Sequence, residues 1–200
     1  MTDDRAADLA RLLAEVRACT VCEAYLPLGP RPIVRGAVTA RLLIISQAPG
    51  TRVHETGLSF DDRSGDRLRD WLGLDRVAFY DESRVAIMPM GFCYPGRLPG
   101  GGDAPPRREC APLWHARLLA AWPDIRLTLY VGSYAIAYYL GGRAAPTMTA
   151  TVASWRDFLP GALPLPHPSW RTAAWERRHP WFGTELLPEL RRRVGAVLGP

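Results

Sequence analysis

The sequence predicts an α/β fold: a three-layer α/β/α sandwich around a central, mostly parallel four-stranded sheet. Short continuous apolar runs, typical of strands buried on both faces, recur along the chain. Segments with apolar residues at helical spacing lie between these runs. Strands that alternate with helices in this way form a parallel sheet, because each helical crossover packs back onto one of its faces.

The predicted elements follow one another in a regular order. A first helix is expected over residues 4–18, which begin with acidic side chains that suit a helix N-terminus. The strands are expected at residues 41–46, 84–90, 126–131 and 162–166, and the later helices at residues 64–74, 107–121, 134–140 and 183–198. We see no internal repeat or domain boundary. Residues 1–200 are therefore expected to form one domain, in which residues 1–40 carry the first helix and a pair of cysteines.

Composition limits the chemistry that this chain can perform. All 25 of its basic side chains are Arg; there is no Lys and no Asn, and Gln47 is the only Gln. The absence of Lys excludes a Schiff-base lysine, a Walker-type phosphate lysine and a lysine general base. The net charge of +5 suits a polyanionic partner, although a high-GC genome also replaces Lys by Arg.

The cellular compartment is predicted from the N-terminal residues and from the length of the apolar segments. The chain starts with acidic residues and has no apolar signal segment, and its longest uncharged stretch, residues 127–142, is too short to span a bilayer. We therefore expect a cytoplasmic protein that does not contact a membrane, and we expect it to be a monomer.

The four cysteines fall into two pairs. Cys19 and Cys22 have CxxC spacing, and Cys93 and Cys110 flank a loop rich in Gly and Pro. Disulfides are disfavoured in a reducing compartment, whereas thiolates are soft ligands that suit zinc or an iron–sulfur cluster. A structural zinc site is one alternative to a cluster. A redox CxxC beside two unrelated buried cysteines is another.

Two loops at predicted strand ends are the candidate site. Residues 47–50 (Gln-Ala-Pro-Gly) follow the first strand in a sharp turn, so the backbone N–H groups of Gln47 and Ala48 are candidates to face a ligand. His167 follows the last strand and is held between two prolines. Because ligands of open α/β sheets bind beyond the carboxyl ends of the strands, both loops are expected to line one site.

The other aromatic and histidine positions allow more than one interpretation. Phe60 either stacks on a flat ligand ring or caps the core. His54, His115 and His179 are interpreted as ordinary surface or packing residues.

Taken together, these motifs resemble the uracil-DNA glycosylase superfamily. Residues 46–50 (Ser-Gln-Ala-Pro-Gly), with Gly57, Phe60 and Gly65 in ungapped register, are similar to its first motif. The nearest form is that of the thermostable iron–sulfur branch (family 4), Gly-Glu-Ala-Pro-Gly followed by Gly-x-Pro-Phe-x-Gly-x-x-Gly. Residues 167–169 (His-Pro-Ser) resemble the second motif. The four cysteines stand where that branch has its [4Fe–4S] ligands, and the resemblance covers about residues 17–195.

The resemblance implies a monofunctional DNA glycosylase in base excision repair. Such an enzyme hydrolyses the N-glycosidic bond of a deaminated base, uracil or a related one, after the base is flipped out of DNA. His167 and the backbone amides of Gln47 and Ala48 would stabilise the departing base. Phe60 would stack on it, with Gln47 and His167 as further base contacts. Water would attack the sugar directly, since the chain has no Lys amine for lyase chemistry.

The resemblance also implies a cofactor and a DNA surface. A [4Fe–4S] cluster, with zinc as the alternative, would be bound by Cys19, Cys22, Cys93 and Cys110. The candidate DNA contacts lie just after the histidine motif or in the loop between the second pair of cysteines: Ser169, Trp170, Arg171, Arg97, Arg107 and Arg108.

Two departures from the family pattern affect the predicted chemistry. Pro89 stands where the iron–sulfur branch has the Asn that recognises uracil, and Gln47 and Ala48 supply no carboxylate to orient water. Nearby acids that would compensate are Glu55, Asp61 and Asp62. We therefore expect an atypical base preference.

Two other functions stay open. One is a catalytically weak or inactive iron–sulfur protein of the same fold that binds nucleic acid. The other is a protein, stabilised by zinc or a cluster, that acts on a nucleotide or free nucleoside.

Overall fold

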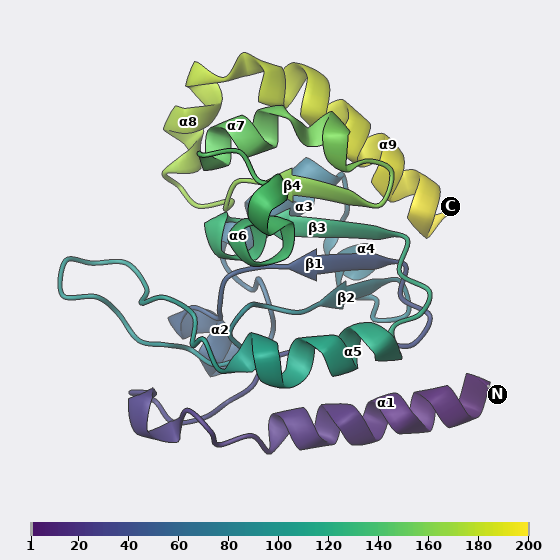
Figure 1. Ribbon diagram of the computed structural model, residues 1–200, viewed down its shortest axis with the longest axis vertical. Helices are drawn as coiled ribbons and strands as arrows, with labels where there is room; N and C mark the ends of the chain where they lie inside the picture. Colours follow the sequence, from purple (N-terminus) through teal and green to yellow (C-terminus); the bar gives the residue numbers. More distant parts are fainter. Residues whose placement is uncertain (1, 200) are drawn as a thin grey trace.

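A computed structural model of the chain describes residues 2–199 and has the predicted α/β architecture (Figure 1). Its central sheet has the strand order β2-β1-β3-β4, and every neighbouring pair is parallel. The strands are β1 (Leu42–Ile45), β2 (Val85–Ile87), β3 (Leu127–Val131) and β4 (Ala162–Leu165). The prediction of a mostly parallel four-stranded sheet is confirmed. Met1 and Pro200, part of the expected domain, lie outside the described residues.

Helices cover both faces of this sheet, as predicted. The α-helices are α1 (Thr2–Arg17), α2 (Thr51–Thr56), α3 (Arg63–Leu72), α4 (Arg76–Tyr80), α5 (Ala116–Ala121), α6 (Ser133–Leu140), α7 (Met148–Ala153), α8 (Thr172–Arg178) and α9 (Leu187–Leu198). Shorter 3₁₀ turns are η1 (Glu23–Tyr25), η3 (Gly141–Arg143) and η4 (Trp155–Phe158), and π-helical turns η2 (Ala111–His115) and η5 (Phe182–Leu186) lead into α5 and α9. No described helix is long and apolar enough to cross a membrane.

The alternation of side chains along β1 divides the core into two layers. Leu42 and Ile44 face the layer that includes Trp71 of α3 and Leu190 of α9. Leu43 and Ile45 face the opposite layer, which includes residues of α1 and α5; these two helices also pack on each other (Figure 1). All four β1 residues are buried, as expected for the central strand of a covered parallel sheet.

Strand pairing continues past the ends of β1 and β2 and positions the loops that follow them. The backbone N–H of Met90 donates to Ser46 O at 2.8 Å, and that of Gly91 donates to Gln47 O at 3.0 Å. The loop after β1 therefore lies directly beside Pro89 in the loop after β2. This edge of the sheet holds the candidate site.

His115 is a buried packing residue, in agreement with its sequence interpretation. Its ring lies between Phe92 and Tyr139, with centroid distances of 5.5 and 5.9 Å and nearly parallel planes. Nδ1 is 2.6 Å from the Tyr139 hydroxyl and Nε2 is 3.2 Å from Pro89 O. A neutral ring satisfies both contacts if Nδ1 accepts from Tyr139 and Nε2–H donates to Pro89. Burial lowers the pKa of His115 to about 4.

This depressed pKa makes the stability of the fold depend on pH. Between pH 6.5 and pH 4 the unfolded chain binds a proton at residue 115 that the folded chain does not bind, so acidification favours unfolding by up to about 3 kcal/mol. His115→Gln keeps hydrogen-bonding capacity without titrating. In urea titrations at pH 7.5 and pH 4.5, the variant should be less stable than wild type at pH 7.5 but should lose less stability on acidification. Equal losses in the two proteins would contradict this assignment.

Candidate active site

A pocket opens at the carboxyl edge of the sheet, where the sequence predicted the site. Its wall combines the loops after β1, β2 and β4 with the segment before α3 and one residue of the loop between Cys93 and Cys110. The lining residues are Ser46, Ala48, Pro49, Gly50, Val53, Ser59, Phe60, Asp62, Ser64, Pro89, Asp103 and His167. Three of the predicted site residues, Ala48, Phe60 and His167, therefore meet in one pocket. Gln47 is next to it, with its carbonyl bonded to Gly91 N, but is not part of the wall.

Phe60 enters the pocket from a tight turn. Asp61 N donates to Leu58 O at 3.3 Å, and Phe60 has a φ of 58°, which is rare for a bulky residue. Its ring packs edge-on against Phe79 at 6.0 Å. Gly65 has to lack a side chain, because a Cβ there would lie 1.7 Å from Phe60 O. Two residues of the first motif, Phe60 and Gly65, are thus in direct contact, and the Phe60 carbonyl occupies the space that a side chain at residue 65 would need.

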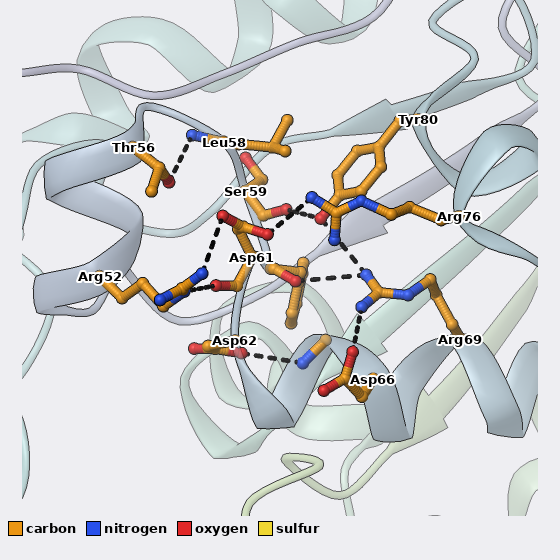
Figure 2. Close-up of polar contacts among 12 residues, drawn as sticks. Arg52, Thr56, Leu58, Ser59, Asp61, Asp62, Asp66, Arg69, Arg76 and Tyr80 are labelled. Atoms are coloured by element: carbon orange, nitrogen blue, oxygen red, sulfur yellow. Dashed lines mark hydrogen bonds and ion pairs between the residues drawn. The ribbon is translucent and has the colours of Figure 1, made fainter.

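Arg69 and Tyr80 hold this turn from behind (Figure 2). The Tyr80 hydroxyl donates to Ser59 O at 2.9 Å, and Arg69 Nη1 donates to Phe60 O at 3.3 Å. The Arg69 guanidinium also lies 5.4 Å from the centroid of the Phe79 ring. Consecutive carbonyls of the turn are therefore fixed by side chains of α3 and α4.

Asp61 and Glu55, two of the carboxylates that the sequence suggested, are not part of the described pocket wall. Asp61 Oδ1 accepts from Arg76 at 2.7 Å, and Asp61 O accepts from Arg52 at 2.6 Å (Figure 2). Its hydrogen bond with Arg76 holds the pKa of Asp61 below its usual value. Glu55 is exposed near the end of α2. Asp61 is thus part of the support of the turn and faces away from the pocket.

Asp62, the next residue along the chain, does line the pocket. It is the N-cap of α3, and its Oδ1 accepts from Gly65 N at 2.9 Å. Among the described residues, its second carboxylate oxygen has no hydrogen-bond partner. Asp62 is also close enough to His167 and Asp103 to act on the pKa of each.

Asp103 is a pocket residue that no sequence signal pointed to. It comes from the Gly- and Pro-rich loop, forms an isolated bridge with Arg97, and lies beside Gly50. Partial burial raises the pKa of Asp103, with the negative charge of Asp62 acting in the same direction and Arg97 opposing it. A lone acid in an irregular loop belongs to no motif or period, and only the fold of that loop brings it to the pocket.

His167 is fixed in the loop after β4. Its carbonyl accepts from Ser169 N at 2.8 Å and from the Thr172 hydroxyl, and Arg67 Nη1 donates to Ser169 O at 3.0 Å. Gly132, with a φ of 91°, lets β3 end close to this loop, since a Cβ there would lie 3.4 Å from His167 Cβ. Burial lowers the pKa of His167, and the charge of Asp62 opposes the shift. The ring is therefore neutral near pH 7, with one nitrogen that donates and one that accepts.

Several predicted DNA-contacting residues lie in the segment after β4 or in the loop between Cys93 and Cys110. Trp170 is 78% exposed, and the Arg171 guanidinium lies 5.1 Å from the centroid of its ring. Ser169 is partly buried, and Arg97 and Arg108 are exposed. Arg107 instead faces the cysteines: it forms an ion pair with Glu109 and lies 4.2 Å from the centroid of the Tyr25 ring.

The four cysteines, all free thiols, line one small cavity away from the pocket. Its other lining residues are Leu26, Pro32, Phe92, Arg107 and Trp114. Burial raises the pKa of Cys93 to about 11 and that of Cys110 to about 12. Within residues 2–199, no three Cys, His, Asp or Glu side chains form a group that could hold a metal ion.

The fold and the pocket define an α/β protein with an aromatic ring, a neutral histidine and two carboxylates at the carboxyl edge of a parallel sheet. The profile of the uracil DNA glycosylase superfamily matches residues 33–191. The chain belongs to this superfamily. Its members are typically DNA N-glycosylases that act on DNA.

Proposed function

We propose that the protein is a monofunctional DNA glycosylase that hydrolyses the N-glycosidic bond of a deaminated base in DNA. The observation that carries this proposal is the pocket itself, which unites Phe60, Asp62 and His167 although about a hundred residues separate the first two from the third. A base inside a duplex is out of reach of such a pocket, so the substrate base has to be extruded. The flat wall formed by Phe60 suits the stacking of such a base.

His167 is the group that stabilises the leaving base. The base departs with the electron pair of the C–N bond, so negative charge gathers on a carbonyl oxygen attached to its ring. A neutral imidazole N–H in a buried site is a preorganised donor for this charge. Ala48, also in the pocket wall, offers its backbone N–H as a second candidate donor.

Asp62 is the carboxylate that orients the attacking water. Water adds to the anomeric carbon of the sugar as the bond to the base breaks, and its proton goes to the carboxylate. Gln47 and Ala48 supply no acid in the first motif. Of the three candidates Glu55, Asp61 and Asp62, only Asp62 lines the described pocket, and one of its oxygens is available. Its negative charge also favours the positive charge that develops on the sugar.

Exposed residues in the segment after β4 and in the loop between Cys93 and Cys110 support contact with the DNA backbone. Trp170 is a large exposed aromatic three residues after His167, suited to entering the gap that an extruded nucleotide leaves. Arg171, Arg97 and Arg108 are exposed cations in the segment after β4 or in the loop between Cys93 and Cys110, suited to phosphates. We propose that the protein binds DNA as a monomer.

The four cysteines are proposed to hold a [4Fe–4S] cluster, which would link the N-terminal segment to the Cys93–Cys110 loop. The residues fit this group, since all four thiols line one cavity whose other walls are largely apolar. A single zinc ion with Zn–S bonds of about 2.3 Å would need the sulfurs gathered around one centre. The described residues contain no such group. A [4Fe–4S] cluster spreads its thiolate ligands over several iron atoms, so its four ligands need not surround one centre.

Purified protein should therefore be brown, with visible absorption and with iron and sulfide in about equal amounts. Cys93→Ser together with Cys110→Ser should remove the colour, because these substitutions leave only two of the four ligands. A colourless wild-type protein that contains one zinc ion per chain would contradict the cluster and favour the zinc alternative.

Base release from oligonucleotides tests the proposed function. The panel should contain uracil, hypoxanthine and xanthine, each in single- and double-stranded DNA. We expect free base from at least one substrate, and a loss of about 100-fold or more in the rate with His167→Ala, the range seen when a donor to a developing anion is removed. His179→Ala, outside the pocket, is the control and should keep its rate.

A second candidate function predicts a different result from the same panel. Pro89 replaces the base-recognising Asn, which favours a protein that binds DNA and has lost its chemistry. Salt-dependent DNA binding without release of any base would support this candidate and overturn the proposed activity.

Asp62→Asn separates water activation from folding. Asn is as good an N-cap as Asp, so the bond from Gly65 N and the stability of α3 should be retained. The single-turnover rate of base release should fall about 100-fold, with little change in DNA affinity. Glu55→Gln is the matched control, because Glu55 is exposed and outside the pocket wall. A larger loss for Glu55→Gln than for Asp62→Asn would reverse the assignment.

A further inference from the structure

The Ser59 hydroxyl is a buried polar group in the pocket wall that has no partner. Ser59 is 5% exposed, and its Oγ makes no hydrogen bond to any of the residues that the structure describes. Such a group costs free energy in the folded protein, because it has left water without gaining a new bond. Other unpartnered side-chain atoms occur in the described chain, on Arg35, His54, Trp114, Trp122 and Glu176, but none of these residues lines this pocket.

The surrounding structure keeps Ser59 in this position. Its carbonyl accepts from the Tyr80 hydroxyl, and the carbonyl of the next residue, Phe60, accepts from Arg69 (Figure 2). The positive φ of Phe60 is maintained by the same contacts. The backbone is therefore not free to turn the hydroxyl out to solvent. The only local freedom is rotation of the hydroxyl about the Cα–Cβ bond.

Ser59 and Pro89, two residues of the same pocket wall, offer the pocket opposite chemistry. Pro89 offers the pocket only an apolar ring: it has no N–H, and its carbonyl is bonded to His115 Nε2. Ser59 stands at the proline of the Gly-x-Pro-Phe pattern that the chain resembles. Of these two residues, only Ser59 has a side chain that can hydrogen-bond a ligand in the pocket.

We propose that the Ser59 hydroxyl recognises the edge of the extruded base, a role that the apolar ring of Pro89 cannot fill. This inference rests on the proposed glycosylase function and adds a specificity-determining residue to it. A hydroxyl both donates and accepts, so it pairs with a ring carbonyl or with a ring N–H of a deaminated base. It makes one bond where an amide makes two, and it rotates. The pocket therefore accepts more than one deaminated base and discriminates among them weakly.

Ser59→Ala tests this role by its effect on base recognition. The rate of release should fall about tenfold for each base that wild type accepts, the loss expected for one hydrogen bond. Affinity for an oligonucleotide with an abasic-site analogue should not change, because that ligand has no base to contact. Thermal stability should stay equal or rise, since the substitution removes an unsatisfied buried group. Ser154→Ala, at an exposed serine outside the pocket wall, is the matched control and should resemble wild type.

The possible results keep this inference separate from the proposed function. If Ser59→Ala releases bases at the wild-type rate while His167→Ala does not, Ser59 has no role in recognition and the glycosylase proposal stands. If wild type releases no base, DNA affinities test the role of Ser59. The preference for uncleavable base-containing DNA over abasic DNA should then be smaller in Ser59→Ala than in wild type. An unchanged preference, or a loss of thermal stability with no effect specific to the base, would overturn the inference.

Discussion

The contact between the Phe60 carbonyl and Gly65 is the constraint on which the pocket depends. A bulky residue in the left-handed region costs roughly 1–3 kcal/mol, so the turn persists only because its surroundings enforce it. The missing side chain at Gly65 makes room for the carbonyl, and Arg69 and Tyr80 bond the two carbonyls of the turn. Ser59, Phe60 and Asp62 consequently share one rigid pocket wall. Each contributes a different chemical group: a hydroxyl, an aromatic ring and a carboxylate.

The pocket wall carries acidic side chains, whereas the chain as a whole is basic. This distribution suits a substrate in which positive charge develops on the sugar and negative charge on the leaving base. The chain has a net charge of +5, yet the residues that line the described pocket include two acids, Asp62 and Asp103, and no Arg. A carboxylate beside the departing base would oppose its negative charge, whereas one beside the sugar would favour the positive charge left there. The neutral His167 is compatible with both, because it donates a hydrogen bond without adding a full charge.

Much of the fold could be predicted because its strands are continuous apolar runs and its long helices are periodic. The short helices α2, α4, α7 and α8 were missed, since five to seven residues are too few for a helical period to be visible. The location of the pocket followed from the rule for parallel sheets. The identity of its acids did not: Asp61 and Asp62 are adjacent in sequence, and only the geometry of the turn decides that Asp61 bonds Arg76 while Asp62 faces the pocket.

The buried ring of His115 is hydrogen-bonded to Pro89, a residue of the pocket wall. Its contact with the Pro89 carbonyl occupies the one polar group that residue 89 retains, and the stacked rings of Phe92 and Tyr139 fix the geometry. That wall therefore contributes shape and apolar surface alone. In the proposed glycosylase, the Ser59 hydroxyl would make a single bond to the base edge, so stacking on Phe60 would contribute a larger share of the binding energy than in a pocket with a bidentate amide. Stacking grows with ring area, so under the proposed function the larger deaminated purines would gain relatively more from Phe60 than uracil would.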